Sequence, residues 1–390
     1  MGDNVPSTPV EIFASDVVFA EATPEQRVVS WHLSSDTWAK PLTEEQYLEA
    51  NEVLSRIEMA RDGGCRFWAL YFRGNPLEVV ASCESFRKTL FVRDPTSPVN
   101  GNAANGSTVT KDDGQITEHL AYGIASVYTN PKYRRLGMAS LMLHKLQEVM
   151  DNEGATGSAL YSDIGRSYYS MLGWAVFPHS EARLNLLSRS RKLKSDTCCD
   201  IKTRWIERPD ELEQLCKLDV DDLKARMCRQ RSDDKVHFAF APTYAQINWQ
   251  LAREDFFART LFGRDIQRRG AATTDGKSWI VWERDWKKEQ LTVLRIVTTQ
   301  PESEARRVDH VWALLGAAVA EASEWGLGAV AVWNPDETTT SGIKATSNAY
   351  ANDVRVVFKQ RDGSLPSFRW RGGLSTAKMV WEDNYYYCWC

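Results

Sequence analysis

The amino-acid sequence predicts a mixed α/β protein of two domains, and three observations point to this fold class. Strand-like and helix-like segments alternate along the chain. Both halves contain two strands, a helix and a further strand in that order, although the sequence itself does not repeat. The length of 390 residues favours two domains over one. We therefore expect domains over residues 1–190 and 204–390, joined by a basic polar linker over residues 191–203.

Local signals justify the elements of the first half. Thr43 is expected to cap a helix, because Gln46 completes a capping box and apolar residues then follow one helical face. A stretch rich in Gly, Asn, Ser and Thr predicts a long loop over residues 94–117. Runs of β-branched and aromatic residues predict strands. The expected strands are 65–73, 77–92 (one long strand or two), 119–129 and 157–162, with helices from Gly137 and over 163–172, the latter capped by Asp163.

The second half continues the alternation of helices and strands. Its longest amphipathic pattern, over residues 304–326, predicts a helix between two strand-like runs. The remaining expectations are a helix at 211–227, a loop leading into a helix at 238–262, and strands at 277–285, 289–300 and 327–334.

Composition argues against several classes of protein. A net charge of −4 argues against a general nucleic-acid binder. No apolar run approaches the length of a membrane span, and residues 1–15 lack the basic and apolar regions of a secretion signal. The eight cysteines form no CxxC pair and no Cys/His spacing typical of a metal site, so we expect no metal. Scattered cysteines without a targeting segment indicate a reducing compartment, most simply the cytosol.

The stretch YTNPKYRRLGMASLMLHKL, residues 128–146, joins a strand to an amphipathic helix through two arginines and a glycine. The N–H groups at a helix start are unpaired and carry partial positive charge, so such an end binds phosphate. Gly137 lets the backbone approach a ligand closely, and Arg134 and Arg135 can add charge-assisted contacts. The alternative is an ordinary strand–helix junction with solvated arginines, and physical chemistry alone favours neither.

Two motifs in the first half resemble a known family. RRLGMA (134–139) fits Arg/Gln-x-x-Gly-x-Gly/Ala and resembles the acyl-CoA pyrophosphate loop of the GNAT N-acyltransferases. YYSMLGW (168–174) resembles the aromatic-Tyr-x-x-x-Gly-aromatic motif of the same family. The resemblance covers roughly residues 45–180 and implies an N-terminal GNAT domain that uses acetyl-CoA. The second half, which lacks such a loop before its helix at 304, is then expected to be a degenerate GNAT-like domain on the substrate side.

The resemblance implies roles for individual residues. Main-chain amides of the loop should bind the CoA pyrophosphate, and the Val127 N–H should polarise the thioester carbonyl. Tyr169 matches the tyrosine that protonates the leaving thiolate, and its alternative is a core aromatic. Ser162 departs from the family pattern, which usually has Asn there. The implied cofactor-binding residues are Val127, Tyr128, Thr129, Arg134, Arg135, Leu136, Gly137, Met138, Ala139, Ser140 and Ser162.

A closer resemblance is to the fungal lysine N6-acetyltransferases of lysine catabolism. It rests on LYSDIGRSYYSMLGW (160–174), FAFAPTYAQINW (238–249) and WEDNYYYCWC (381–390). It implies acetyl transfer from acetyl-CoA to the side-chain amine of free L-lysine. The alternatives are another acceptor (a polyamine, another amino acid or a protein lysine) and a non-catalytic acyl-CoA-binding protein. The oligomeric state is left open.

The reaction requires a group that removes a proton from the amine. With a pKa near 10.4, only about one lysine side chain in a few thousand is neutral at pH 7. Glu118, before the central strand, and Glu84, on the preceding strand, are the side-chain candidates for the base. Because no cysteine has a recognisable catalytic partner, direct attack in a ternary complex is expected. An Arg or Lys of the second domain should hold the substrate carboxylate.

The chain ends in an aromatic stretch, WEDNYYYCWC, which should pack against the protein rather than fray. N-myristoyltransferases, which also have two GNAT-like halves, use a terminal carboxylate as the base. This resemblance makes Cys390 a further candidate for the amine's proton. The alternative is a tail that only holds the two domains together.

Overall fold

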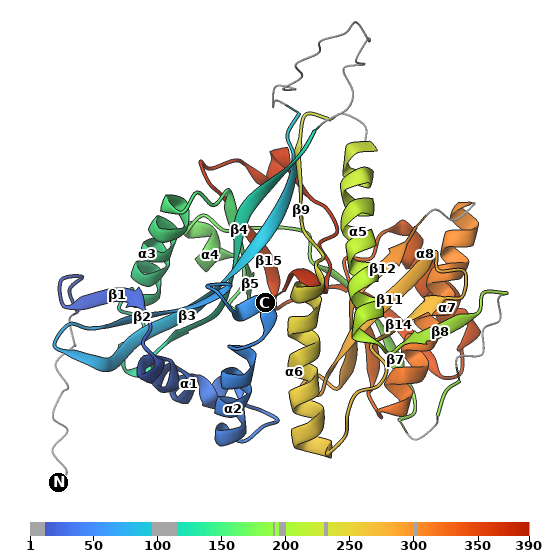
Figure 1. Ribbon diagram of the computed structural model, residues 1–390, viewed down its shortest axis with the longest axis horizontal. Helices are drawn as coiled ribbons and strands as arrows, with labels where there is room; N and C mark the ends of the chain where they lie inside the picture. Colours follow the sequence, from blue (N-terminus) through green and yellow to red (C-terminus); the bar gives the residue numbers. More distant parts are fainter. Residues whose placement is uncertain are drawn as a thin grey trace, which may run out of the picture.

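The computed structural model describes residues 12–95, 115–189, 192–194, 200–229, 233–299 and 303–389. Most of the predicted loop at 94–117, part of the predicted linker at 191–203 and Cys390 lie outside these ranges. Two mixed β-sheets form two halves that lie side by side, with helices α5 (Pro209–Arg229) and α6 (Tyr244–Phe262) between them (Figure 1). The predicted fold class, a mixed α/β protein with two sheets, is confirmed.

The first sheet has helices on both faces (Figure 1). Helices α1 (Pro24–Trp38) and α2 (Glu44–Leu54) cover one face, and α3 (Met138–Asn152) and α4 (Ser167–Met171) cover the other. The strand order is β1 (Val17–Glu21), β2 (Cys65–Phe72), β3 (Asn75–Arg93), β4 (Ile116–Thr129), β5 (Gly157–Ser162), β15 (Leu365–Trp370) and β6 (Ala175–Val176), with β9 (Val236–Phe240) on β3 and β16 (Met379–Trp381) on β9.

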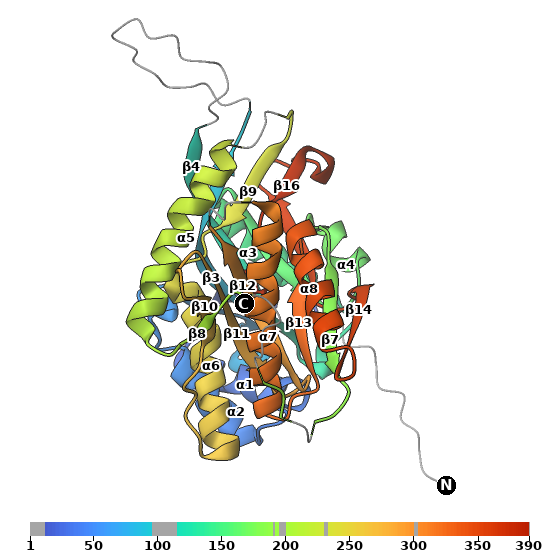
Figure 2. The ribbon, with the colours of Figure 1, turned by 90° about the vertical axis from the view of Figure 1, so that its right-hand side faces the viewer.

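The second sheet carries α7 (Glu304–Glu324) and α8 (Glu337–Ala349) on its outer face (Figure 2). None of the described helices is both long enough and apolar enough to cross a bilayer. The strand order is β14 (Val354–Gln360), β7 (Ser180–Leu186), β13 (Ala329–Trp333), β12 (Gln290–Thr298), β11 (Ser278–Asp285), β10 (Gly270–Thr273) and β8 (Thr203–Ile206).

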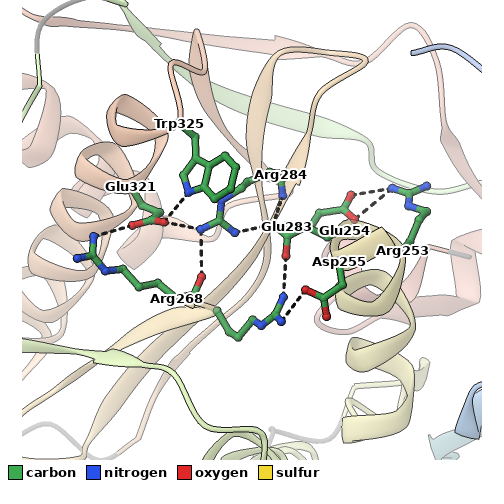
Figure 3. A network of polar contacts seen from close by, with 9 residues as sticks. Arg253, Glu254, Asp255, Arg268, Glu283, Arg284, Glu321 and Trp325 are labelled. Atoms are coloured by element: carbon green, nitrogen blue, oxygen red, sulfur yellow. Dashed lines mark hydrogen bonds and ion pairs between the residues drawn. The ribbon is translucent and has the colours of Figure 1, made fainter. Parts of the chain in front are cut away.

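A network of buried ion pairs joins α6, the second sheet and α7 (Figure 3). The Arg284 guanidinium donates to Glu254 and to Glu321, each at 2.5 Å. Arg269 donates to Glu254 at 3.3 Å, and Arg268 donates to Glu321 at 3.2 Å. Each buried charge in this network therefore has an opposite charge beside it, as buried charges generally require.

Strand pairing crosses the predicted division between residues 1–190 and 204–390. Strand β7 precedes residue 190 but lies in the second sheet, whereas β9, β15 and β16 follow it and lie in the first. The chain passes from one sheet to the other four times, between β6 and β7, β8 and β9, β9 and β10, and β14 and β15. The crossings at residues 177–179 and 361–364 touch, because the Arg361 N–H donates to the His179 carbonyl at 2.9 Å. The exact limits of the two domains stay a prediction.

Several expected elements are confirmed and some are wrong. The capping box of Thr43 and Gln46 opens α2, and β5 spans the expected residues 157–162. The segment before α6 is not a loop, because β9 occupies 236–240 and every one of its residues is buried. Asp163 does not cap α4, which begins at Ser167; its carboxylate instead accepts a hydrogen bond from the N–H of Ser364 at 2.7 Å.

Candidate active site

A wedge opens between the central strands of the first sheet. The parallel pair β4–β5 runs only from Ala121 and Gly157 to Ile124 and Leu160. Strand β4 continues to Thr129 and stays paired with β3 on its other edge. The main chain of β4 beyond residue 124 therefore has no β5 partner within the described sheet. Exposed main-chain groups of this kind can pair with the amides of an extended ligand.

A β-bulge lies on β4 at the start of this wedge. The register between β3 and β4 shifts between Ser82 and Glu84, and Ser126 has a left-handed backbone with φ 53°. Bulges commonly redirect a backbone next to an active site. Val127, whose N–H was expected to polarise the thioester carbonyl, lies in this bulge, because Ser126 and Val127 together lie opposite Cys83.

The loop after β4 leads to an open helix N-terminus. Gly137, with φ 77°, is the N-cap of α3 and leaves the helix without a side-chain cap. Arg134 is held back toward β4, because its guanidinium donates to the Thr129 carbonyl at 3.2 Å and to the Tyr128 hydroxyl at 3.1 Å. Arg135 is exposed. The uncapped N–H groups and the nearby cations suit a phosphate group.

The corresponding helix of the second half, α7, has a side-chain cap at its N-terminus. The Ser303 side chain caps α7 by accepting the Arg306 N–H at 3.2 Å. This difference between α3 and α7 agrees with an anion site in the first half alone.

Tyr169 lies in α4 and is 9% exposed. It belongs to the buried cluster that contains Ile124 and Leu160, the last joined pair of β4 and β5. Burial raises the pKa of the Tyr169 hydroxyl, so this group stays protonated at neutral pH and can donate a proton. The hydroxyl of the neighbouring Tyr168 lies 3.0 Å from that of Ser140, in the first turn of α3.

The turn that precedes α4 is held by Ser162. Its hydroxyl donates to the Gly165 carbonyl at 2.7 Å and accepts the Ile164 N–H at 3.3 Å. Both contacts lie within the turn Ser162–Gly165, so Ser162 stabilises the turn that leads into α4 and thereby helps to position Tyr169. Its contact with a cofactor stays a prediction.

Glu84 lies on the opposite face of the sheet from α3. It pairs with Ala125 of β4, beside the bulge, and its half-buried side chain lines a small hollow beneath α1 and α2. Burial raises the pKa of the Glu84 carboxyl to about 7, although a hydrogen bond from Ser126 opposes the shift. A carboxylate with such a pKa suits a general base at neutral pH. The hollow is lined also by Arg27, Trp31, Trp38, Tyr47, Phe67 and Trp68.

The geometry argues against Glu118, the other candidate base. Glu118 lies near the start of β4, about 30 Å from Val127 along the strand at roughly 3.3 Å per residue. Its side chain is exposed and accepts a hydrogen bond from Lys224 at 2.5 Å. The predicted strand over 119–129 already implied this separation of Glu118 from Val127, whereas the ion pair with Lys224 depends on a contact that the sequence does not show.

The C-terminal tail is clamped between the two halves through its main chain. Gln246 donates to the Tyr387 carbonyl at 3.0 Å, and Lys88 donates to the Cys388 carbonyl at 2.7 Å. Lys88 lies on β3, four residues after Glu84 and on the same face of the sheet. The tail therefore packs against the face that carries Glu84.

Aromatic contacts also connect the C-terminal tail with this face of the sheet. The Trp389 ring lies 6.5 Å from that of Trp249, which packs edge-to-face on Phe86 at 5.4 Å. Gln250 donates to the Trp389 carbonyl at 3.0 Å. Cys390 is outside the described residues, so its role as a base stays a prediction.

Helix α1 contributes many of the residues that line the hollow, but it was not predicted from the sequence. Its buried residues are mostly polar, among them Gln26, Ser30 and Ser34, so it lacks the apolar stripe that marks a helix. A signal was present, because Thr23 and Gln26 form a capping box like that of α2. Within the ranges that the structure describes, no group of three or more His, Cys, Asp or Glu residues could hold a metal ion.

Comparisons with known proteins agree with this architecture. Residues 187–390 match the family described as LYC1 GNAT-like C-terminal domain. A protein of Saccharomyces cerevisiae, described as uncharacterized, is 23% identical over 414 aligned residues, which cover 96% of this chain and 98% of that protein.

Two solved structures share the fold. One is the GCN5-related glucosamine N-acetyltransferase region of a fungal multi-domain GH3 beta-N-acetylglucosaminidase, with a TM-score of 0.52 and 10% identity over 91% of this chain and 38% of that one. The other is a probable N-acyltransferase from Enterococcus faecalis, with a TM-score of 0.50 and 8% identity over 91% of this chain and 72% of that one. The fold and the family match support an N-acetyltransferase of the GNAT type. With more than half of its length matched, the chain belongs to the family of the LYC1 GNAT-like C-terminal domain.

Proposed function

We propose that the protein transfers the acetyl group of acetyl-CoA to the side-chain amine of free L-lysine by direct attack in a ternary complex. One observation carries the proposal. A wedge begins at an uncapped helix N-terminus and narrows to a point with a protonated tyrosine, Tyr169, on one face of the sheet and a carboxylate of raised pKa, Glu84, on the other.

The residues of the wedge suit an acyl-CoA. The N–H groups of α3 and the cations Arg134 and Arg135 would bind its pyrophosphate. The unpaired main chain at residues 125–129 would pair with the amides of its pantetheine arm. The Val127 N–H would then donate to the thioester carbonyl and stabilise the negative charge that develops on its oxygen.

The two titratable residues divide the proton transfers between them. Glu84 takes the proton of the ammonium group, directly or through a water molecule. Transfer from a group of pKa 10.4 to one of about 7 costs about 5 kcal/mol, against about 8 kcal/mol for an ordinary glutamate. Tyr169 protonates the sulfur as the thiolate leaves. The raised pKa of Glu84 therefore suits the role of acceptor, and Tyr169 is protonated at neutral pH, as a proton donor must be.

The hollow at Glu84 favours an aliphatic amine. Rings of Trp31, Trp38 and Tyr47 line it, and aromatic faces pack well on methylene chains and attract cations. A polyamine, another amino acid or a protein lysine are the alternative acceptors within the same chemistry. A non-catalytic acyl-CoA-binding protein would need neither Glu84 nor Tyr169 at this point.

An acceptor screen tests the proposal. Purified protein is mixed with acetyl-CoA and single amines, and the release of free CoA is followed by its thiol. We expect L-lysine to give the highest kcat/KM in a panel that includes ornithine, spermidine and a lysine-containing peptide. A panel in which spermidine or the peptide exceeds lysine would contradict the choice of acceptor, and no turnover with any amine would contradict the activity itself.

A further inference from the structure

An arginine shares the hollow beneath α1 and α2 with Glu84. Of the described residues that line this hollow, Arg27 of α1 is the one cation and Glu84 of β3 is the one acid. Burial raises the pKa of Glu84, and the positive charge of Arg27 opposes this shift, so the two groups act on each other. A cation of the second half was expected to hold the substrate carboxylate, but the described lining of the hollow comes entirely from the first half.

A phenylalanine beside Glu84 places the Arg27 guanidinium. Phe67 of β2 lies directly opposite Glu84 of β3, so the two side chains share one face of the sheet, with Cβ atoms about 5 Å apart. The Arg27 guanidinium lies over the Phe67 ring, 4.7 Å from its centroid. The cation and the carboxylate are therefore neighbours on this face, about 5–10 Å apart.

The Arg27 side chain has nitrogens that are free to bind a ligand. Its Nε donates to the Ala22 carbonyl at 3.3 Å, which holds the side chain against α1. Within the described chain, its two Nη nitrogens form no hydrogen bond and no ion pair, with Glu84 or with any other residue, and neither of them is buried. A guanidinium in this state can donate two parallel hydrogen bonds to a carboxylate.

The two charges are spaced for an amino acid with a long side chain. In extended lysine the side-chain nitrogen lies about 7 Å from the α-carboxylate, because six bonds of about 1.5 Å join them. An ammonium group at Glu84 would therefore bring this carboxylate to Arg27. A diamine also fits Glu84, but its second ammonium group would meet a like charge at Arg27.

The size of the hollow decides how such an acceptor lies. Its free volume of about 20 Å³ has room for one water-sized group. An ammonium group has that size and a whole lysine does not, so the amine enters the hollow and the rest of the acceptor lies at its mouth. Arg27, with its accessible nitrogens, and the half-buried rings of Trp38 and Tyr47 lie where the hollow meets the solvent.

We propose that Arg27 binds the α-carboxylate of the acceptor and so selects amines that carry a carboxylate. The inference rests on the proposed function, because it assigns the acceptor's second contact in the same site. Arg27 does not touch the reacting atoms and acts as a specificity-determining residue.

Three acceptors separate the contributions of the carboxylate and the amine. L-Lysine and 6-aminohexanoate carry both groups at the same spacing, whereas cadaverine has the same amine without a carboxylate. Loss of a hydrogen-bonded charge pair should lower kcat/KM of Arg27→Gln by about 10- to 100-fold with the first two, mainly through KM, and should not lower it with cadaverine. Arg27→Lys, which keeps the charge without the fork of nitrogens, should recover part of the loss.

The control variant and the pH isolate this effect. Arg56→Gln changes an exposed arginine that pairs with Glu52 and does not line the hollow, so it should match wild type with all three acceptors. Removing the charge of Arg27 should also raise the pKa of Glu84, which would slow the reaction of every acceptor near neutral pH. Rates are therefore compared at about pH 9, where Glu84 is ionised in each variant.

The outcomes distinguish this inference from the proposed function. Equal loss with all three acceptors, or no loss with any, would overturn the role of Arg27 while leaving the acetyltransferase intact. Wild type that acetylates cadaverine as well as 6-aminohexanoate would overturn it too. A thermal-shift experiment covers the case in which wild type acetylates no amine. L-Lysine should raise the Tm of wild type but not of Arg27→Gln, and CoA should raise both; a lysine shift that survives in the variant, or is absent from wild type, would refute the inference.

Discussion

Replacing Glu84 with glutamine should abolish most activity and stabilise the protein at the same time. Glutamine keeps the shape of the side chain and can still hydrogen-bond with Ser126, but it cannot take a proton from the amine. Loss of a general base typically lowers the rate by about 10²- to 10⁴-fold. We therefore expect kcat to fall by at least about 10²-fold, with acetyl-CoA binding unchanged.

The raised pKa of Glu84 sets the pH dependence of the wild-type rate. With a pKa of about 7, kcat/KM should rise with pH up to neutrality and fall about tenfold per pH unit below about pH 6. With an ordinary glutamate as the base, this acidic limb of the pH–rate profile, in which kcat/KM falls as the pH falls, would lie below about pH 5. The Glu84→Gln variant should lack the limb altogether.

The same pKa fixes the sign of the effect on stability. Because the folded-state pKa lies above the ordinary value of 4.5, the folded protein holds this proton more tightly than the unfolded chain does. Glu84 contributes fully to stability below about pH 4.5, and this contribution is lost as the pH rises through about 7. The ionised carboxylate at pH 8 then costs up to about 3 kcal/mol, which glutamine avoids.

The assay compares Tm and pH–rate profiles of wild type and Glu84→Gln. The gain in Tm of the variant over wild type should be larger at pH 8 than at pH 5. A variant that keeps the acidic limb would show that another group, such as the terminal carboxylate, removes the proton. A Tm difference that does not change with pH would show that Glu84 is ionised without penalty, and the assignment of a raised pKa would be wrong.

Three further predictions concern the remaining parts of the site. Tyr169→Phe should lower kcat by about 10²-fold with little change in acetyl-CoA affinity, and a wild-type pH–rate profile from this variant would remove Tyr169 from the mechanism. Gly137→Asp should fold, because a Cβ at this position meets no heavy atom within 4 Å and the left-handed backbone (φ 77°) costs aspartate only about 1–2 kcal/mol. It should nevertheless lose CoA binding measured by calorimetry, since it brings a negative charge to the proposed pyrophosphate site. One residue added after Cys390 moves the terminal carboxylate while the clamped carbonyls of Tyr387 and Cys388 stay in place. If the carboxylate is catalytic, kcat should fall sharply at unchanged Tm, whereas a fully active extended protein would leave the tail a structural role.

The sequence predicted the parts of the site that depend on local structure. The strand, the glycine and the helix around residues 134–139 follow one another along the chain, so their relation could be read directly. Tyr169 was identified from a local motif in the same way. The structure adds that Gly137 leaves α3 without a side-chain cap. The sequence alone left open an anion site and an ordinary strand–helix junction, and a helix start without a cap agrees with the anion site.

The remaining parts depend on contacts between distant segments. Strand β15, from the last quarter of the chain, pairs with β5, and no feature of the sequence at residues 365–370 predicts that pairing. The pKa of Glu84 is raised by burial in a hollow that α1 helps to line, although Arg27 of α1 opposes the shift. The buried face of α1 is polar and so carries no amphipathic signal.

The central claim is that the wedge between β4 and β5 delivers an acetyl group to a side-chain amine, and product identification tests it most directly. The protein is incubated with acetyl-CoA and L-lysine labelled with ¹⁵N at the side-chain nitrogen, and the product is examined by mass spectrometry and NMR. We predict a singly acetylated lysine whose new amide carries the labelled nitrogen, formed by wild type and lost with Glu84→Gln. Acetylation at the α-nitrogen, or equal product from Glu84→Gln, would contradict the account.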